Sequence, residues 1–347
     1  MKVKVGIIGL GGIGQIHLEK FKAFPEKVQI VAVSDVVPSL VGDTAKKYGA
    51  EGYGDSDKLL DRKDVDAVSI CVPNYLHAQV AVAAAEAGKH ILLEKPIAVT
   101  LNEADAIISA VEKSGVKLML GFNQLFNPMI IQTKKLIEAG RLGKISLVKT
   151  QYVRNLSGFS REKFGWRANV KQVGGGVLTE SGAHRISLSR FLGGDVERVS
   201  AFTKRLVMDI DAEDTAVVLL DYKRGGLGTV ICSWAAEFRG PEWEKIEVYG
   251  TEGSVIGYGD TRQGLAHLEF SNVNIPEYGR IHSYFPPSNI FTGGFDSYKN
   301  EIEHFLDCIT TDTDPIATGY DGKAILEITL AAYKSAEMQK AISIPLQ

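Results

Sequence analysis

The 347-residue sequence has few cysteines and no large excess of either charge. Its three cysteines, Cys71, Cys232 and Cys308, are far apart and form no CxxC pair, which argues against a disulfide framework and predicts no metal site. Acidic residues outnumber basic residues by 42 to 39, so the chain lacks the basic surface typical of nucleic-acid-binding proteins. The composition therefore favours a protein that handles small molecules, with no nucleic-acid partner.

Long hydrophobic runs are also missing. No stretch approaches the roughly 20 apolar residues of a membrane-spanning helix, so no membrane partner is expected. The apolar N-terminal segment is interrupted by glycines and no small-residue cleavage site follows it, which argues against a signal peptide. We therefore expect a cytoplasmic protein, and the chain length suggests about two domains.

The first third of the chain alternates short apolar runs with helical patterns. The runs are almost continuously apolar, which is typical of parallel strands covered on both faces. Strand–helix alternation of this kind predicts a doubly wound parallel sheet, the Rossmann arrangement, over residues 1–121. The expected strands are Val3–Ile8, Val28–Ser34, Ala67–Val72, His90–Leu93 and Leu118–Leu120, and the expected helices are Ile13–Phe24, Ser39–Tyr48, Tyr75–Ala87 and Leu101–Ser114.

Beyond residue 121 the pattern predicts a second, α+β domain over residues 122–347. Four strand-like runs follow one another, and Gly225-Gly226 between two of them predicts a hairpin turn in a mainly antiparallel sheet. Late helices on one face would leave the other face open, so we expect a homodimer or homotetramer formed through this sheet. The expected strands are Lys144–Val153, Val196–Arg205, Thr215–Tyr222, Leu227–Trp234 and Lys245–Tyr249, and the expected helices are Pro128–Ala139, one opened by Gly174-Gly175-Gly176, Ser297–Ile309 and Gly322–Gln339.

The segment Gly9-Leu10-Gly11-Gly12-Ile13-Gly14 fits the GxGxxG motif. It follows an expected strand and opens a helix, as in dinucleotide-binding domains. The first glycine makes the tight turn, the second lets the backbone approach a pyrophosphate, and the third allows close packing of helix and strand. The pyrophosphate would bind at the helix N-terminus. The alternative is a glycine-rich turn with a purely structural role.

Asp35 ends the second expected strand, 21 positions after Gly14 (35 − 14). A carboxylate at about this spacing accepts hydrogen bonds from the adenosine ribose and repels a 2′-phosphate. The next residue is Val36 rather than an arginine, which favours NAD over NADP. The alternative is a solvated aspartate at a strand end.

Three further motifs give the whole chain a family resemblance. They are Cys71-Val72-Pro73-Asn74-Tyr75-Leu76-His77, then Glu94-Lys95-Pro96 after an apolar strand, and Gly174-Gly175-Gly176 followed by Glu180 and His184. In this order they resemble the glucose–fructose oxidoreductase, inositol dehydrogenase and rhizopine-catabolism family (Gfo/Idh/MocA). The resemblance implies an NAD-dependent dehydrogenase with a Rossmann domain and a substrate-binding domain.

The resemblance also assigns roles to individual residues. Lys95 matches a lysine that contacts substrate and cofactor, and His184 matches the general acid/base. The family usually has aspartate at the position of Glu180 and arginine near Gln124, so the role of residue 180 and the identity of the substrate stay open. The candidate cofactor residues are Gly9, Gly11, Gly12, Ile13, Gly14, Asp35, Val72, Pro73, Asn74, His77, Glu94, Lys95 and Pro96, and the candidate substrate residues are Lys95, Asn123, Trp166, Arg167, Glu180 and His184.

The residue types support these roles independently. Lys95 follows an apolar strand, so it is expected at the carboxyl end of the sheet, where open α/β sheets bind ligands. Pro96 restricts the backbone of Lys95 and is compatible with a cis bond. Without the resemblance, a surface salt bridge explains Lys95 equally well.

Glu180 and His184 are four positions apart on an expected helix, and Leu188 continues their row, so this face points inward. Gly182 inside the helix indicates that something packs close to its backbone, and Gly174-Gly175-Gly176 suits a backbone pressed against a ligand. The alternative is that His184 is a structural histidine.

Basic and aromatic residues alternate between Arg154 and Lys171. This segment predicts either a lid over a sugar, with Trp166 and Arg167 nearest the ligand, or a solvated basic loop.

The expected reaction is the oxidation of an alcohol of an inositol-like polyol, a sugar or a sugar derivative. His184 would remove the hydroxyl proton, because its ordinary pKa lies near working pH, and Lys95 would stabilise charge on the oxygen. Glu180, the third catalytic candidate, would hold the imidazole or bind a neighbouring substrate hydroxyl. Two alternatives remain open: reduction of another unsaturated substrate, and a regulatory protein that binds the dinucleotide without turnover.

Overall fold

The computed structural model describes residues 2–237, 244–260, 265–275, 279–281 and 296–346. The chain forms two compact units. The first contains residues 1–123 and 298–326, and the second contains residues 124–297 and 327–347. Helix α11 (Gly319–Met338) contributes to both.

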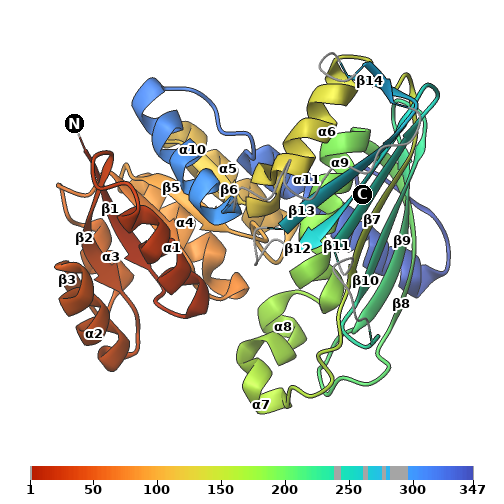
Figure 1. Ribbon diagram of the computed structural model, residues 1–347. Coiled ribbons are helices and arrows are strands. Elements are labelled where there is room, and N and C mark those ends of the chain that lie inside the picture. Colours follow the sequence, from red (N-terminus) through yellow and green to blue (C-terminus); the bar gives the residue numbers. More distant parts are fainter. Residues whose placement is uncertain (1, 238–243, 261–264, 276–278, 282–295, 347) are drawn as a thin grey trace. The chain divides into compact units, whose positions relative to one another are not determined.

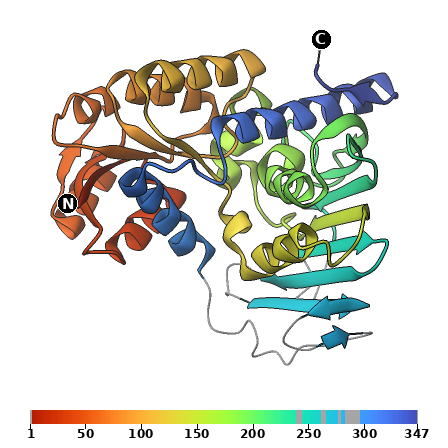
Figure 2. The same ribbon diagram turned by 90° about the horizontal axis from the view of Figure 1, so that it is seen from above.

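The first unit is built on a six-stranded parallel sheet in the order β3-β2-β1-β4-β5-β6. Figure 2 shows helices on both faces of this sheet, as predicted for a doubly wound fold. The short elements β3 and α3 were not predicted. The strands are β1 (Val3–Ile8), β2 (Val28–Ser34), β3 (Glu51–Tyr53), β4 (Ala67–Ile70), β5 (His90–Glu94) and β6 (Leu118–Gly121), and the helices are α1 (Gly12–Lys22), α2 (Pro38–Tyr48), α3 (Ser56–Leu60), α4 (His77–Glu86) and α5 (Leu101–Ser114).

Helix α10 (Ser297–Thr311) belongs to the first unit from Tyr298 onward. Its apolar face, with Ile302 and Phe305, is buried, and the Lys27 ammonium after α1 lies 2.9 Å from carboxylate oxygens of both Glu303 and Asp307. From the sequence, we expected residues 298–326 in the second domain. The difference arises because an amphipathic pattern shows that a helix has a buried face but not which surface it meets.

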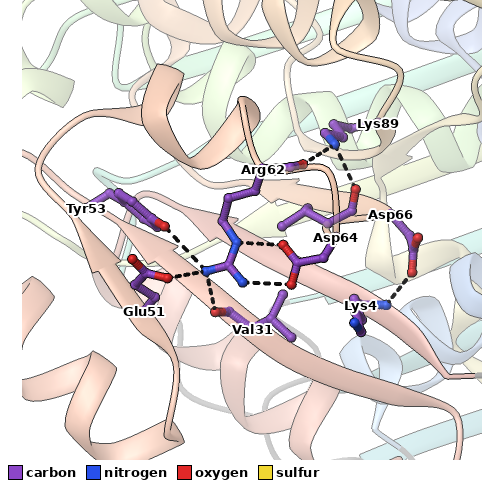
Figure 3. A network of polar contacts seen from close by, with 9 residues as sticks. Lys4, Val31, Glu51, Tyr53, Arg62, Asp64, Asp66 and Lys89 are labelled. Atoms are coloured by element: carbon purple, nitrogen blue, oxygen red, sulfur yellow. Dashed lines mark hydrogen bonds and ion pairs between the residues drawn. The ribbon is translucent and has the colours of Figure 1, made fainter.

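A polar network holds the connection that leads into β4 (Figure 3). The Arg62 guanidinium binds Asp64 in a bidentate pair at 2.9 and 2.8 Å and also reaches Glu51 at 2.8 Å. The buried Lys89 ammonium donates to the carbonyl oxygens of Arg62 and Val65. The contacts of Lys89 lie at the amino ends of β4 and β5. They therefore stabilise the end of the sheet opposite to the glycine motif, which follows the carboxyl end of β1.

The second unit contains an eight-stranded sheet in the order β13-β12-β11-β7-β10-β9-β8-β16. Only the β7–β10 pair is parallel among the described pairs of this sheet, so the prediction of a mainly antiparallel sheet is confirmed. Gly225 and Gly226, with φ of 78° and 91°, form the predicted turn between β9 and β10. The strands are β7 (Ile145–Val153), β8 (Val196–Lys204), β9 (Thr215–Tyr222), β10 (Leu227–Ser233), β11 (Glu244–Gly250), β12 (Ser254–Asp260), β13 (Leu265–Ser271) and β16 (Ile342–Ser343), with a separate pair β14 (Val273–Ile275) and β15 (Gly279–Ile281).

Helices of the second unit lie on one face of its sheet (Figures 1 and 2). On the other face, Phe202 is 72% exposed and Leu219 is 53% exposed, although both lie in the middle of strands. The open face that the sequence predicted is therefore present in the described part of the chain. The helices are α6 (Pro128–Glu138), α7 (Arg161–Phe164), α8 (Val170–Val173) and α9 (Ala183–Gly193), with the second part of α11.

Candidate active site

The glycine motif forms a tight turn between β1 and α1. Gly9 has a φ of +91°, and a Cβ atom there would lie 2.6 Å from the carbonyl oxygen of Cys71. A Cβ atom on Gly14 would lie 2.0 Å from the carbonyl oxygen of Gly9. The first and third glycines of the motif are therefore required by the packing of the turn itself.

Gly11 and Gly12 are explained differently, because a Cβ atom on either would meet nothing within 4 Å. Packing of the protein does not require glycine there. In addition, no side chain caps the start of α1 within the described residues, which leaves its backbone N–H groups available to an anion. Open space at the second glycine beside an uncapped helix N-terminus fits the pyrophosphate of a dinucleotide.

We expect Gly11→Ala to leave the melting temperature within about 2 °C, because its φ of −65° suits alanine, and to weaken NAD binding at least about tenfold. Gly14→Ala should lower both the melting temperature and the NAD affinity, because its methyl group overlaps the Gly9 carbonyl. Thermal denaturation and NAD titration of the two variants test this. Normal NAD affinity in Gly11→Ala would show that the backbone there does not approach the cofactor.

Asp35 lies directly after β2 and anchors the glycine turn. Its Oδ2 accepts the Leu10 N–H at 2.7 Å and its Oδ1 accepts the Val37 N–H at 2.9 Å. The side chain is half-buried, and Val36 beside it is 86% exposed. The sequence prediction that this carboxylate also accepts a ribose hydroxyl is compatible with the free lone pairs that a carboxylate oxygen retains.

Further candidate cofactor residues follow β4 and β5. Asn74 begins the 3₁₀ turn Asn74–Leu76 and is buried, and His77, the first residue of α4, is fully buried. The His77 Nδ1 lies 2.6 Å from the carbonyl oxygen of Pro96, and its Nε2 lies 3.0 Å from that of Val72. The buried His77 ring thus links the segment after β4 to the segment after β5.

Lys95 is half-buried at the carboxyl end of β5, where the sequence analysis placed it. The Lys95–Pro96 peptide bond is cis, as the sequence analysis allowed. The backbone N–H of Lys95 donates to the carboxylate of Glu94 at 3.2 Å. A Cβ atom on Gly121 would lie 3.1 Å from the same carboxylate, so glycine in β6 makes room for it.

Behind Glu94 lies a group of buried titratable residues that sequence reasoning missed. The fully buried His17 of α1 places Nε2 3.2 Å from Glu94 Oε1 and Nδ1 2.7 Å from the Ser69 hydroxyl. Burial acts to lower the pKa of His17, but contacts with Cys71 and Glu94 outweigh it and raise this pKa well above its ordinary value. Glu301 of α10 is also fully buried, and burial, with Glu94 nearby, raises its pKa well above the ordinary range.

This group predicts a pH dependence of stability. The folded protein keeps the proton on Glu301 at pH values where the unfolded chain has lost it, so the free energy of unfolding falls as pH rises above the ordinary carboxyl pKa. Glu301→Gln removes that contribution. We expect the melting temperature of the variant relative to wild type to rise by at least about 2 °C between about pH 5 and pH 8. A difference that stays constant with pH would show that Glu301 is ionised in the folded protein.

In the second unit, Glu180 and His184 lie on consecutive helical segments. Glu180 belongs to a π-helical turn, Leu178–Gly182, which leads directly into α9, where His184 is half-buried. Glu180 is buried, and its Oε2 accepts the Arg167 Nε–H at 3.0 Å. A π-turn is rare and is found frequently at functional sites.

The glycines near this helix pack against the protein itself. A Cβ atom on Gly175 would lie 2.1 Å from the Tyr333 hydroxyl, and one on Gly176 would lie 1.9 Å from the carbonyl oxygen of Glu213. A Cβ atom on Gly182 would lie 2.8 Å from Leu178. The close packing predicted at Gly182 is present. At Gly175 and Gly176 the close neighbours are Tyr333 and Glu213, where we had expected a ligand.

The basic segment that precedes this helix is ordered into short helices and a 3₁₀ turn, Gly165–Ala168. The Arg161 guanidinium binds Asp211 at 2.7 Å. The Arg167 guanidinium carbon lies 4.3 Å from the centre of the half-buried Trp166 ring, so Arg167 is held between Trp166 and Glu180. The structure thus brings together three of the candidate substrate residues.

The candidate residue Asn123, the last residue of the first unit in this part of the chain, is buried and begins the 3₁₀ turn Asn123–Phe126. The neighbouring Gln124 amide donates to the buried Glu244 carboxylate at 3.1 Å. Glu244, Glu213 and Tyr333 were not predicted from the sequence, because each acts through a partner far away in the chain.

Within the described residues, no helix is long and apolar enough to cross a membrane. The same residues contain no cluster of three or more histidine, cysteine or acidic side chains that could hold a metal ion.

Comparison with known proteins places this architecture in a family. A myo-inositol 2-dehydrogenase from Thermotoga maritima is 30% identical, with 99% of this chain and 98% of the relative covered. The NAD-binding Rossmann fold of the Gfo/Idh/MocA oxidoreductases matches residues 3–122, and the C-terminal domain of the same family matches residues 130–256. The chain belongs to the Gfo/Idh/MocA oxidoreductase family. The expectation of NAD as the cofactor is thereby confirmed.

Further members of the Gfo/Idh/MocA family show the same likeness. A levoglucosan dehydrogenase from Pseudarthrobacter phenanthrenivorans is 29% identical over 99% of this chain and 98% of its own. A solved structure of levoglucosan dehydrogenase in complex with NADH and levoglucosan matches with a TM-score of 0.89 and 25% identity, covering 100% of both chains. The present chain is an NAD-dependent dehydrogenase of this family.

Proposed function

We propose that this dehydrogenase oxidises a secondary alcohol of a polyol, sugar or sugar derivative, with NAD as the hydride acceptor. The observation that carries the proposal is the half-buried Lys95 at the carboxyl end of β5, in the same unit as a glycine turn open to a pyrophosphate. Full-length similarity to inositol and levoglucosan dehydrogenases supports this substrate class.

In the proposed reaction, the His184 imidazole accepts the hydroxyl proton of the substrate and later releases it to solvent. Bound NAD would supply the hydride acceptor: as the C–H bond of the carbinol carbon breaks, its hydride, with two electrons, would pass to NAD and leave a ketone. Lys95 donates a hydrogen bond to the substrate oxygen and stabilises the negative charge that develops on it. Protons and electrons balance without a further reactant.

Glu180, Arg167 and Trp166 are proposed to bind the rest of the substrate. The Glu180 carboxylate would accept hydrogen bonds from substrate hydroxyl groups, and the Trp166 ring would offer an apolar face for sugar carbons. Asn123 is proposed as a further hydrogen-bonding residue.

The proposed function is tested by NADH formation with purified protein across inositols, aldoses, anhydrosugars and sugar acids, with NAD and NADP run in parallel. We expect turnover on one group of cyclic polyols or sugars and a preference for NAD, because the Asp35 carboxylate would repel a 2′-phosphate. A preference for NADP would contradict the role of Asp35. Tight NAD binding without turnover on any substrate would favour the regulatory alternative.

We also propose that the open face of the second sheet binds a second copy of the chain. Phe202, Val217 and Leu219 form an exposed apolar group on β8 and β9, and Phe202 is paired with Val217 across the two strands. An apolar surface on a sheet of this size is commonly covered in an oligomer. Sedimentation of the purified protein should give a dimer or tetramer, whereas a monomer at micromolar concentration would contradict this proposal.

A further inference from the structure

The helical segment that carries Glu180 and His184 begins with three backbone N–H groups bound by residues from distant parts of the chain. The Gly176 N–H donates to the Tyr333 hydroxyl at 3.1 Å. The Val177 N–H donates to the Glu213 carbonyl oxygen at 3.0 Å, and the Leu178 N–H donates to Glu213 Oε1 at 2.9 Å. A helix start normally leaves such groups without intrahelical partners, so Glu213 and Tyr333 act as its cap.

The two capping residues are also bound to each other. The Tyr333 hydroxyl donates to Glu213 Oε1 at 2.9 Å and lies 3.0 Å from the Thr179 hydroxyl. Glu213 is buried, and this burial raises its pKa above the ordinary range. The hydrogen bonds therefore join the π-turn to helix α11, through Tyr333, and to the segment that leads into β9, through Glu213.

The glycines before the helix allow this arrangement. Any side chain on Gly175 would overlap the Tyr333 hydroxyl, and any side chain on Gly176 would overlap the Glu213 carbonyl oxygen. The triple-glycine segment is thus shaped by its contacts with the cap.

The opposite end of the helix is held by a different tyrosine. The buried Tyr222 of β9 donates its hydroxyl to the carbonyl oxygen of Ser189 at 3.1 Å and lies 2.7 Å from the Ser189 hydroxyl. The chain thus offers two tyrosine hydroxyl groups bound to the same helical segment, one before Glu180 and one after His184.

We propose that Glu213 and Tyr333 are positioning residues for the dehydrogenase reaction: their cap fixes the π-turn, and the π-turn fixes the orientation of Glu180 and His184 toward the substrate. This inference rests on the proposed function. Displacement of a reacting group by about 1 Å can lower a rate about a hundredfold, so a loosened cap has consequences for turnover.

The test compares Tyr333→Phe with the matched control Tyr222→Phe. Each variant removes one hydroxyl group bound to the same helical segment. We expect Tyr333→Phe to lower kcat about 10- to 100-fold and to raise the deuterium isotope effect on kcat, because the chemical step becomes slower. Tyr222→Phe should keep kcat within about twofold, and NAD affinity should be unchanged in both.

The isotope effect separates positioning from a merely structural role. A partly unfolded sample loses kcat in proportion to its active fraction, but its KM and isotope effect stay those of the wild type. Equal losses of kcat in the two variants, or an unchanged isotope effect in Tyr333→Phe, would overturn the proposal.

A second pair of variants keeps the test open if Tyr333→Phe folds poorly. Glu213→Gln keeps an oxygen that accepts the Leu178 N–H and the Tyr333 hydroxyl, so we expect it to retain most of kcat. Glu213→Leu loses both hydrogen bonds and should behave as Tyr333→Phe does. Equal kcat values in Glu213→Gln and Glu213→Leu would also overturn the proposal.

Failure of the proposed function gives a different result from failure of the cap. If the wild type turns over no polyol or sugar, amide hydrogen exchange measures the cap without any activity. Faster exchange of residues 176–182 in Tyr333→Phe, but not in Tyr222→Phe, supports a cap that holds the π-turn. Unchanged exchange in both variants rejects it.

Discussion

Replacing His184 with alanine is expected to lower kcat by about 10²- to 10⁴-fold while leaving NAD affinity within about twofold, because the variant lacks the group that accepts the hydroxyl proton. His184 belongs to the second unit, whereas the glycine turn and Asp35 belong to the first. Steady-state kinetics with the substrate identified for the wild type, together with NAD titration, measure the two quantities separately.

His304→Ala is a suitable control for this prediction. His304 of α10 is also half-buried, and its Nε2 accepts the Ile316 N–H at 3.1 Å. No role in turnover is proposed for His304. The control should lose some stability and keep kcat per folded molecule within about twofold. Full activity in His184→Ala would contradict the role of His184 as general base. Loss of NAD binding would instead give His184 a role in binding the cofactor.

Replacing Lys95 with methionine is expected to lower kcat/KM by about 10²- to 10³-fold, the effect typical of removing one preorganised donor to a developing oxyanion. Methionine fills a similar volume at this half-buried position, so the melting temperature should stay close to that of the wild type. Lys95→Arg should not restore activity, because a planar guanidinium does not present a single compact donor.

Lys89→Met provides the opposite control at the other end of the same strand. The buried Lys89 ammonium binds the carbonyl oxygens of Arg62 and Val65 at 2.6 and 2.9 Å (Figure 3). Its loss leaves these buried carbonyl groups unsatisfied and should lower the melting temperature while kcat per folded molecule is retained. Should Lys95→Met reduce stability as Lys89→Met does and keep its turnover, Lys95 would be a structural residue.

The Rossmann unit could be predicted well because its signals are local. The strands Val3–Ile8 and Val28–Ser34 coincide with the predicted ranges, and Gly9 and Gly14 serve the turn that their spacing indicated. β3 was missed because Glu51–Tyr53 is three residues long and has no apolar run. Length and periodicity are the main strand signals in a single sequence, and this strand has neither.

The parts of the site that depend on long-range contacts could not be predicted. The glycines before residue 177 indicated close packing, but not that the neighbour was Tyr333, more than 150 positions away. Glu301 lies on the buried face of α10 with Ile302 and Phe305, but only the fold shows that this carboxyl lies near His17 and Glu94. The partners of a buried charged residue come from other elements, so the local sequence does not identify them.

The proposed transfer of a hydride from a carbinol carbon to NAD is tested most directly with the substrate found in the NADH assay, deuterated at the carbon that is oxidised. We predict that the deuterium appears in the NADH produced, with a primary isotope effect on kcat/KM. Deuterium found in the solvent, or in the product with unlabelled NADH, would contradict the proposed reaction.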